Sequence, residues 1–598
     1  MIFSRRGAFS FFRTGGPLHI PHQRVVLALV AAGFAVNATV VSASPLRSGY
    51  AADVPQRSGI RDLGRAQPSL PVTVAVTLNY EHPAELDELV QLQSDPGSRL
   101  YHRFLTNAQF NGYFAPTLAS YQRAAAALSR SGFRITQTFA NRTVIDATAP
   151  AGVVERYFRT QIDRVAARGV GLRYANATPA LIPTELRGIV GSVSGLNDLD
   201  VVAPLYRFPS PAQRLAQQQR ARADVISGSG TSSEPSPEIA GKPIGGPLHG
   251  PDGGYGPLAT AQGYDLPVQH GHNGSGLAAG VVIWADYLPS DLNVYAREFG
   301  IRRTGTTSKV PVDGGGTFDG NINDPGNASV EAELDIETIL GNSPGANIIV
   351  YEFPQPSDRD IEDAYNAAVS ANAVAVVNSS FGGCESADTS FDTATNQIAK
   401  QAAAKGMTFS AASGDSGSDE CNGSLGVSAP AGDPDFVSVG GTSLRVNSAG
   451  DWTSEVVWNS NGGAGGGGVS TVFARPSYQR GIGGVIPSGR NQPDIALSSD
   501  PSYGTSFYFN GAWDGPVGGT SWASPVFTAY LTQVAQVRGA RAGLVNPSLY
   551  STLTNSGYTY YHDITLGDNF GYAAKKGYDQ ASGIGSIRTG NGLAPKLR

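Results

Sequence analysis

The order of apolar and helical segments between residues 277 and 439 constrains the fold most strongly. Short, largely apolar runs there are separated by segments with helical periodicity. Apolar runs without alternation predict strands buried on both faces, and strands alternating with helices predict a doubly wound parallel sheet. The predicted strands are 277–285, 347–353, 373–379, 407–412 and 436–439, and the predicted helices are 330–340, 361–371 and 395–404. Functional residues are therefore expected at the carboxyl ends of these strands.

The front of the chain has a different pattern, and 598 residues are too many for one ordinary domain. Residues 72–78 alternate in the manner of a half-buried strand, and 134–140 and 142–148 read as two further strands. Helical patterns cover 83–93 and 118–131. Strands and helices mixed without a βαβ rhythm predict an α+β domain.

The first residues have the features of a signal peptide. An apolar run at 25–36 follows four arginines and precedes the small residues Val41, Ser42 and Ala43. A membrane anchor is the alternative, but a spanning helix needs about 20 apolar residues and this run is shorter. We therefore expect a signal at 1–43, a secreted, extracellular protein, and no membrane attachment after signal removal.

The chain has two cysteines, Cys384 and Cys421. In an oxidising compartment one disulfide is the simplest use of both, and two isolated thiols are the alternative. No histidine lies near either cysteine in the sequence, which argues against a zinc site or a cysteine nucleophile.

Charge is distributed unevenly along the chain. Residues 1–250 contain 25 Lys+Arg and 16 Asp+Glu, whereas 251–598 contain 18 and 33. A basic front and an acidic back attract one another, and protonation of carboxylates would weaken that attraction. The pattern suggests an inhibitory front segment released at low pH, although a role in solubility alone would give the same counts.

Between residues 209 and 256 the apolar pattern disappears. The stretch reads AQRLAQQQRARAD, SGSGTSSEPSPE and GPLHGPDGGYGP. Such composition predicts an exposed linker, and a basic run followed by Ser, Pro and Gly is a natural processing site.

Residues 518–525, GGTSWASP, place a serine at the start of an apolar run. The glycines allow a tight turn, and Pro525 suits the first turn of a helix. Ser521 would then lie at a helix N-terminus, where backbone N–H groups can stabilise an oxyanion. A glycine turn capped by Ser or Thr is the alternative.

A base for Ser521 must be a carboxylate, because the three histidines beyond residue 250 do not begin a helix after an early strand. Glu331 and Asp335 share one face of a predicted helix, although a solvated acidic face is the alternative. A carboxylate base suits an acidic medium. Asp415, directly after a predicted strand, could donate a hydrogen bond to the oxyanion when protonated, or could form an Asx turn.

These motifs together resemble the sedolisin family of serine-carboxyl peptidases, in its kumamolisin-like form. The resemblance rests on GGTSWASP, on ELD with a Glu two residues before it, on SGDSG, and on DPGSRLYHRFLTNAQF at 95–110, which resembles the family's propeptide. It implies Ser521 as nucleophile, Glu331 as general base, Asp335 orienting that Glu, and Asp415 as oxyanion donor. It also implies a subtilisin-like catalytic domain after an α+β, ferredoxin-like propeptide with an antiparallel sheet.

The C-terminal region has features of a calcium site. Two aspartates in a Gly/Asn-containing loop offer oxygen ligands of the kind that Ca²⁺ prefers, although aspartates are also common turn formers. The resemblance implies one Ca²⁺ site, with carboxylates from Asp563 and Asp579 and backbone carbonyls from Ile564, Lys575 and Gly577.

The domain organisation expected is a signal at 1–43, a propeptide domain at 44–205, an exposed processing linker at 206–256 and a catalytic domain at 257–598. We expect a secreted, monomeric, acid-active endopeptidase that cleaves proteins or peptides, is inhibited by its own propeptide, matures by self-cleavage, and binds no nucleic acid. The alternatives are a tripeptidyl-peptidase of the same family and a non-catalytic calcium-binding module.

Overall fold

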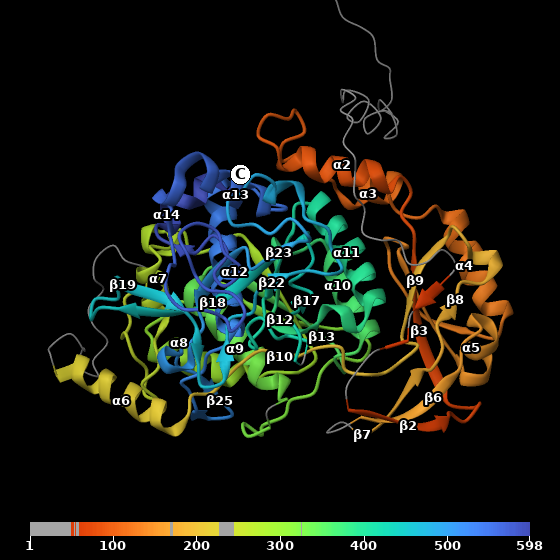
Figure 1. Cartoon of the computed structure of the whole chain (residues 1–598), viewed down its shortest axis with the longest axis horizontal. Coiled ribbons are helices and arrows are strands. Elements are labelled where there is room, and N and C mark those ends of the chain that lie inside the picture. Colours follow the sequence, from red (N-terminus) through yellow and green to blue (C-terminus); the bar gives the residue numbers. More distant parts are fainter. Residues whose placement is uncertain are drawn as a thin grey trace, which may run out of the picture. The chain divides into compact units, whose positions relative to one another are not determined.

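The computed structural model describes residues 50–52, 54–55, 59–167, 171–226, 244–324, 326–421 and 423–597 (Figure 1). The predicted signal at 1–43 lies outside the described residues. The described residues belong to one compact unit by their internal contacts.

The front section contains a four-stranded antiparallel sheet in the order β4-β5-β3-β9. Alternate valines of β3 lie fully buried against α4 and α5, which explains the period-two pattern. The bounds are β3 (Pro71–Leu78), β4 (Arg134–Thr138), β5 (Val144–Pro150), β9 (Val190–Ser194), α2 (Pro83–Ser94), α3 (Asn107–Tyr113), α4 (Leu118–Arg130) and α5 (Ala151–Phe158). The predicted α+β domain with an antiparallel sheet is confirmed.

Several shorter strands complete this section. A second antiparallel sheet joins β2 (Ile60–Arg65), β6 (Ile162–Ala167) and β7 (Gly171–Asn176), and β1 (Tyr50–Ala52) pairs with β8 (Ala180–Leu181). The sequences of these strands show no strong apolar pattern, because most of their residues are exposed or only half-buried.

The back section is built on an eight-stranded sheet in the order β12-β13-β11-β14-β16-β18-β19, with β24 also paired to β18. All pairings are parallel except that of β19, so the predicted parallel α/β sheet is confirmed. The bounds are β11 (Ala278–Ile283), β12 (Thr307–Pro311), β13 (Asn347–Glu352), β14 (Val376–Ser379), β16 (Thr408–Ala412), β18 (Phe436–Val446), β19 (Trp452–Val457) and β24 (Ile495–Ser498).

Helices cover both faces of this sheet, which explains why its strands are apolar throughout (Figure 1). Val376 and Val437 pack in the same apolar cluster as residues of α12 (Thr520–Arg538). Their neighbours Val377 and Phe436 point to the opposite face, in the cluster of α10 (Asp358–Ala371) and α11 (Thr389–Ala404). The remaining helices of the section are α7 (Pro257–Gly263), α8 (Pro289–Glu298), α9 (Ala328–Asn342), α13 (Asn546–Ser556) and α14 (Gly590–Leu593).

The predicted exposed linker is partly wrong. Residues 211–226 form α6 (Pro211–Ile226), because Ala, Gln and Arg are good helix formers even without an apolar stripe. Gln217 is buried and donates to the carbonyl of Gly504, and Arg214 donates to the carbonyl of Gly515 at 2.6 Å. Asp252 is also buried, so the chain is packed again before residue 256. Residues 227–243 lie outside the described ranges.

The front domain contacts α10 and α11, and we call these contacts the docking surface. The hydroxyl of Ser194 donates to Glu362 at 2.5 Å, and the hydroxyl of Tyr80 donates to the carbonyl of Gln397 at 3.0 Å. The two ion pairs that join residues 59–200 to the back section in the described chain are Asp87–Lys400 and Asp146–Arg359. Both place the acid on the front domain, whereas Arg207, which also belongs to the basic front section of the chain, pairs with Asp415 of the acidic back.

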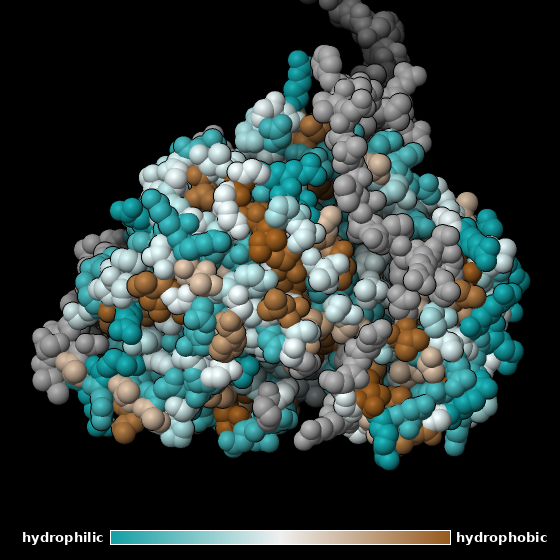
Figure 2. Space-filling model, in the orientation of Figure 1, coloured by the Kyte–Doolittle hydropathy of each residue, from teal (hydrophilic) through white to brown (hydrophobic). Residues whose placement is uncertain are grey.

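The described surface carries no sign of a membrane-spanning element. None of the helices in the described ranges combines the length and the apolar character that crossing a bilayer requires. On the face in Figure 2, hydrophobic residues lie among hydrophilic ones.

Candidate active site

Ser521 lies in the first turn of α12, as the glycine motif predicts, and is fully buried. Gly519 precedes the helix with φ 104°, a conformation that favours glycine. A Cβ on Gly519 would lie 2.3 Å from the carbonyl oxygen of Leu205, so the close approach of two backbones also requires glycine. Pro525 lies inside the helix, beyond the predicted first turn. Its missing N–H removes a donor to the Ser521 carbonyl, whose oxygen lies 3.4 Å from the hydroxyl of Ser380.

The hydroxyl of Ser521 donates to Glu331 Oε2 at 2.7 Å. Glu331 belongs to α9, which packs closely against α12 and presents this side chain to the start of the neighbouring helix. The Ser521 hydroxyl also lies 2.9 Å from the carbonyl oxygen of Ser380. The predicted serine–carboxylate pair is therefore in hydrogen-bonding contact.

Asp335 lies one helical turn after Glu331 and is held by Ser380, whose hydroxyl donates to Asp335 Oδ1 at 2.5 Å. In the described residues, Glu331 Oε1 and Asp335 Oδ2 have no hydrogen-bond partner although both are buried. A proton on either carboxyl would lower the repulsion between two buried negative charges. Burial and then the neighbouring Asp335 charge raise the pKa of Glu331 well above its usual range, and burial raises the pKa of Asp335 to about 8.

Asp415 follows the carboxyl end of β16 and faces the same serine turn. Its Oδ1 accepts hydrogen bonds at 2.8 Å from both the N–H and the hydroxyl of Thr520. Its Oδ2 has no hydrogen-bond partner in the described chain and lies 3.6 Å from Nε of Arg207. Burial raises the pKa of Asp415 to about 6, against the opposing effects of Thr520 and Arg207.

Two participants were missed from the sequence. Ser380 follows strand β14 and contacts both Ser521 and Asp335, and its place at a strand end is a signal that could have found it. The other is the stretch 203–207, which lies in the same cleft as Asp415 and which we call the cleft segment. The cleft has a volume of about 1270 Å³.

The three histidines of the back section are engaged elsewhere or lie on other loops. His270 binds Asp265 at 2.6 Å, and His562 stacks on Trp452 with ring centroids 3.9 Å apart. Neither His270, His562 nor His272 hydrogen-bonds to Ser521 among the described contacts, in agreement with the expected carboxylate base.

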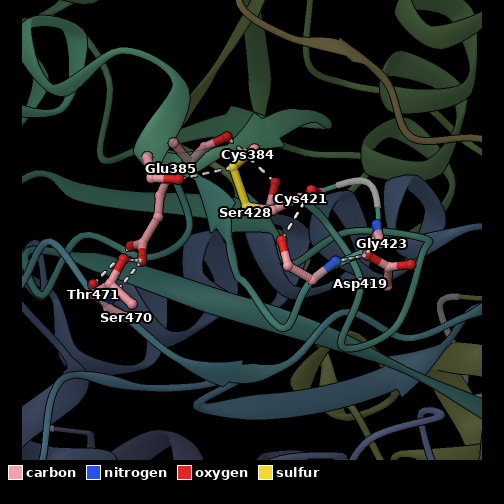
Figure 3. Close-up of a disulfide and its surroundings, with 11 residues drawn as sticks. Cys384, Glu385, Asp419, Cys421, Gly423, Ser428, Ser470 and Thr471 are labelled. Carbon is pink, nitrogen blue, oxygen red and sulfur yellow. Dashed lines mark hydrogen bonds between the residues drawn. A yellow bond between two sulfur atoms is a disulfide. The ribbon is translucent and has the colours of Figure 1, made fainter. Parts of the chain in front are cut away.

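Cys384 and Cys421 form a disulfide, the simpler of the two alternatives, and both line the cleft (Figure 3). Cys384 ends strand β15 (Phe381–Cys384), and the next residue, Glu385, is held by further hydrogen bonds. Glu385 accepts from the hydroxyl of Ser470 at 2.7 Å and from the N–H of Thr471 at 2.6 Å (Figure 3). The disulfide thus joins one wall of the cleft to the loop that follows Asp415.

The residues predicted to bind Ca²⁺ lie in one loop cluster. Asp563 accepts from the N–H of Gly577 at 3.2 Å, and Asp579 accepts from the N–H of Lys575 at 2.9 Å. In the part of the chain that the structure describes, no donor is bonded to the carbonyl oxygens of Ile564, Lys575 or Gly577. Two carboxylates and three free carbonyls fit a hard cation such as Ca²⁺.

A second acidic cluster, Asp146, Asp313 and Asp363, could by its spacing hold a metal. Arg359 already supplies a cation there, because its Nη1 lies 3.2–3.5 Å from all three carboxylates. Glu333 had no predicted role. Its carboxylate accepts from the N–H of Leu288 at 2.7 Å and so holds the residue that precedes α8.

Comparison with known proteins matches residues 58–199 to a family described as "Pro-kumamolisin, activation domain" and residues 316–573 to the "Subtilase family". Sedolisin from Pseudomonas sp. (strain 101) is 31% identical over 540 residues, covering 86% of this chain and 85% of that protein. Xanthomonalisin from Xanthomonas sp. (strain T-22) is 31% identical, covering 87% of this chain and 65% of that protein.

Two further similarities bear on the fold and on the alternatives. A solved structure of Pseudomonas sedolisin, titled a serine-carboxyl proteinase complexed with pseudo-iodotyrostatin, is 29% identical with a TM-score of 0.51 and covers 58% of this chain and 98% of that one. Tripeptidyl-peptidase 1 from Bos taurus is 28% identical, covering 82% of this chain and 84% of that protein. With an activation domain, a subtilase-type domain and relatives along most of its length, the chain belongs to the sedolisin family of serine-carboxyl peptidases, which are hydrolases.

Proposed function

We propose that this protein is a secreted, acid-active endopeptidase made as a self-activating precursor, with Ser521 as nucleophile. The observation that carries the proposal is the 2.7 Å hydrogen bond from the Ser521 hydroxyl to Glu331. A buried serine beside a buried carboxylate, with a carboxyl oxygen of Asp415 that has no hydrogen-bond partner among the described residues near the same turn, has the parts that acyl transfer requires.

In the proposed mechanism, Ser521 Oγ attacks the peptide carbonyl and its proton passes to Glu331. Asp335 shares a proton with Glu331, which leaves Glu331 Oε2 free to accept. The amine of the cleaved bond takes the proton from Glu331 as it departs. Water, activated by the same carboxylate, then hydrolyses the ester on Ser521.

The oxyanion would be held by the N–H of Ser521 and by protonated Asp415. A carboxyl can donate this bond only while it carries its proton. Because burial raises the pKa of Asp415 to about 6, the donating form is present below about pH 6 and is lost as the pH rises through that value. This supports acid activity.

The position of the cleft segment favours endopeptidase action over tripeptidyl-peptidase action. The cleft segment is an internal stretch of the chain whose backbone pairs with β15 and with Gly518, as an internal stretch of a polypeptide substrate would. We further propose that the propeptide domain, residues 44–205, is an intramolecular inhibitor and that processing takes place within residues 206–256. The mature enzyme is then a monomer that acts on protein or peptide substrates.

Replacement of Ser521 by Ala tests the proposed function. We expect Ser521→Ala to remain a full-length precursor at pH ~4 and to hydrolyse casein at least about 10³-fold more slowly than wild type. Ser524→Ala, which alters a neighbouring buried hydroxyl that binds Asn378, is the control and should retain activity. Maturation of Ser521→Ala at the wild-type rate would contradict the proposal.

We propose one Ca²⁺ site formed by Asp563 and Asp579 with the carbonyls of Ile564, Lys575 and Gly577. Such an ion would tie two loops together and so stabilise the folded catalytic domain. We expect EGTA to lower the Tm, and added Ca²⁺ to restore it, in wild type but not in Asp579→Ala. An unchanged Tm with EGTA would contradict the site.

A further inference from the structure

The cleft segment lies along the active site as an added strand. Ala203 and Pro204 form β10 (Ala203–Pro204), which pairs antiparallel with β15 through Ala203↔Gly382 and Pro204↔Phe381. On the other side of Ser521, Arg207 exchanges two backbone hydrogen bonds with Gly518, at 2.9 and 2.8 Å. The backbone is therefore fixed both before and after residues 205 and 206.

Within this segment, the carbonyl of Leu205 has a distinct environment. The N–H of Ser521 donates to it at 3.1 Å. A Cβ placed on Gly519 would lie 2.3 Å from this oxygen and 2.7 Å from Asp415 Oδ2, so both oxygens converge over the same glycine. The N–H of Leu205 donates to Glu331 Oε2 at 2.9 Å, the oxygen that also accepts from Ser521. The Leu205 carbonyl thus lies among the nucleophile, the base and the two oxyanion donors.

The side chains on either side of this carbonyl are also held. Leu205 is buried, with its Cδ1 against Gly382. Tyr206 packs beside Phe208 against an apolar cluster, and its hydroxyl donates to the carbonyl of Asp324 at 3.0 Å. The cleft therefore accommodates an apolar side chain at position 205 and an aromatic side chain at position 206.

We infer that the first self-cleavage of this precursor breaks the peptide bond between Leu205 and Tyr206. The inference rests on the proposed serine peptidase mechanism. Ser521 Oγ bonds to the Leu205 carbonyl carbon and its proton passes to Glu331. The bond to the Tyr206 nitrogen then breaks as that nitrogen takes the proton from Glu331. Water hydrolyses the Leu205–Ser521 ester, leaving a new carboxyl-terminus at Leu205 and a new N-terminus at Tyr206.

This position differs from the Gln/Arg run to which the composition of the linker points. That run lies in α6, where Gln217 is buried and the backbone is helical. A peptide bond must be extended to pair with strands in the cleft, so α6 would have to unfold before it could be cut. After the cut at Leu205, the front domain would be held only by non-covalent contacts.

The first cut can be mapped directly. The precursor is purified at pH ~8, shifted to pH ~4, and quenched at short times for intact mass measurement and N-terminal sequencing. We expect the earliest pair of products to end at Leu205 and to begin at Tyr206, with a rate independent of protein concentration. An earliest cut at any other bond overturns the inference.

A substitution provides a second test. Leu205→Asp places a carboxyl group in the buried position against Gly382, and we expect cleavage at this bond to slow at least about 10-fold. Leu215→Asp, at an exposed position of α6, is the matched control and should cleave at the wild-type rate. Equal rates for the two variants overturn the inference. If wild type cleaves neither itself nor an added peptide, the proposed function fails; if it cleaves the peptide and itself elsewhere, only the inference fails.

Discussion

The docking surface and the cleft segment both hold the front of the chain against the back, but they respond to protons in opposite senses. At the docking surface, burial raises the pKa of Asp358 to about 8 and raises the pKa of Glu362 well above its usual range. Groups with raised pKa values bind protons more tightly when buried, so the folded, docked precursor is stabilised as the pH falls from these values towards the usual carboxylate range. In the cleft, the proposed mechanism instead has protonation of Asp415 supply the donor that cleavage needs.

The difference revises the simplest interpretation of the charge pattern. Uneven charge suggested that acid releases the front domain by neutralising carboxylates. The carboxylates at the docking surface contribute with the opposite sign, because those buried there gain stability on protonation. Under the proposed mechanism, acid would therefore act in the cleft, and release of the front domain would require the covalent connection to be cut.

Among the substitutions that test this comparison, we expect Arg207→Gln to have the largest effect, on the pH dependence of self-cleavage. The Arg207 cation, 3.6 Å from Asp415 Oδ2, opposes the rise in the pKa of Asp415 that burial causes. Its removal raises that pKa further, so Asp415 becomes protonated at a higher pH. We expect the midpoint of self-cleavage against pH to move upward by roughly 0.5–1 unit, measured by gel or mass spectrometry.

The groups that face Asp415 are Arg207, Glu331, Glu420 and Thr520, and the substitution changes only the first. Arg214→Gln is the control, because it removes the same charge from α6, where Arg214 binds the carbonyl of Gly515. A midpoint for Arg207→Gln that is unchanged, or that moves downward, would show that Asp415 does not set the pH of cleavage.

A smaller effect is expected from Glu362→Gln at the docking surface, tested in the uncleavable Ser521→Ala precursor. Glutamine can still accept from the Ser194 hydroxyl but avoids burying a negative charge. We expect the Tm to rise by a few degrees at pH ~8 and to change little at pH ~4.5, where Glu362 is already protonated. Glu298→Gln, at an exposed position of α8, is the control. A Tm gain at pH ~4.5 equal to that at pH ~8 would contradict a raised pKa for Glu362.

Much of the fold was predictable because buried strands and amphipathic helices leave strong periodic signals. Ser521, Glu331, Asp335 and Asp415 could be proposed from residue type and order, since glycine turns and strand ends are local features. The role of Ser380 depends on two helices and a strand meeting in space, which spacing alone does not give.

The linker illustrates the other limit of sequence. Its composition predicts exposure, yet α6 is ordered by hydrogen bonds from Arg214 and Gln217 to carbonyls about 290–300 residues later. The pairing of β10 with β15 likewise uses backbone groups, which every sequence offers equally. Interactions of main chain with main chain carry almost no signature in side chains.

The most direct test of the account is the pH dependence of peptide hydrolysis by the mature enzyme. The need for a protonated Asp415 predicts a maximum of kcat/KM on the acid side, at pH ~3–5, with activity falling as the pH rises through about 6. A flat profile, or a maximum near pH ~8, would contradict the central claim that carboxyl groups perform the work of a histidine beside Ser521.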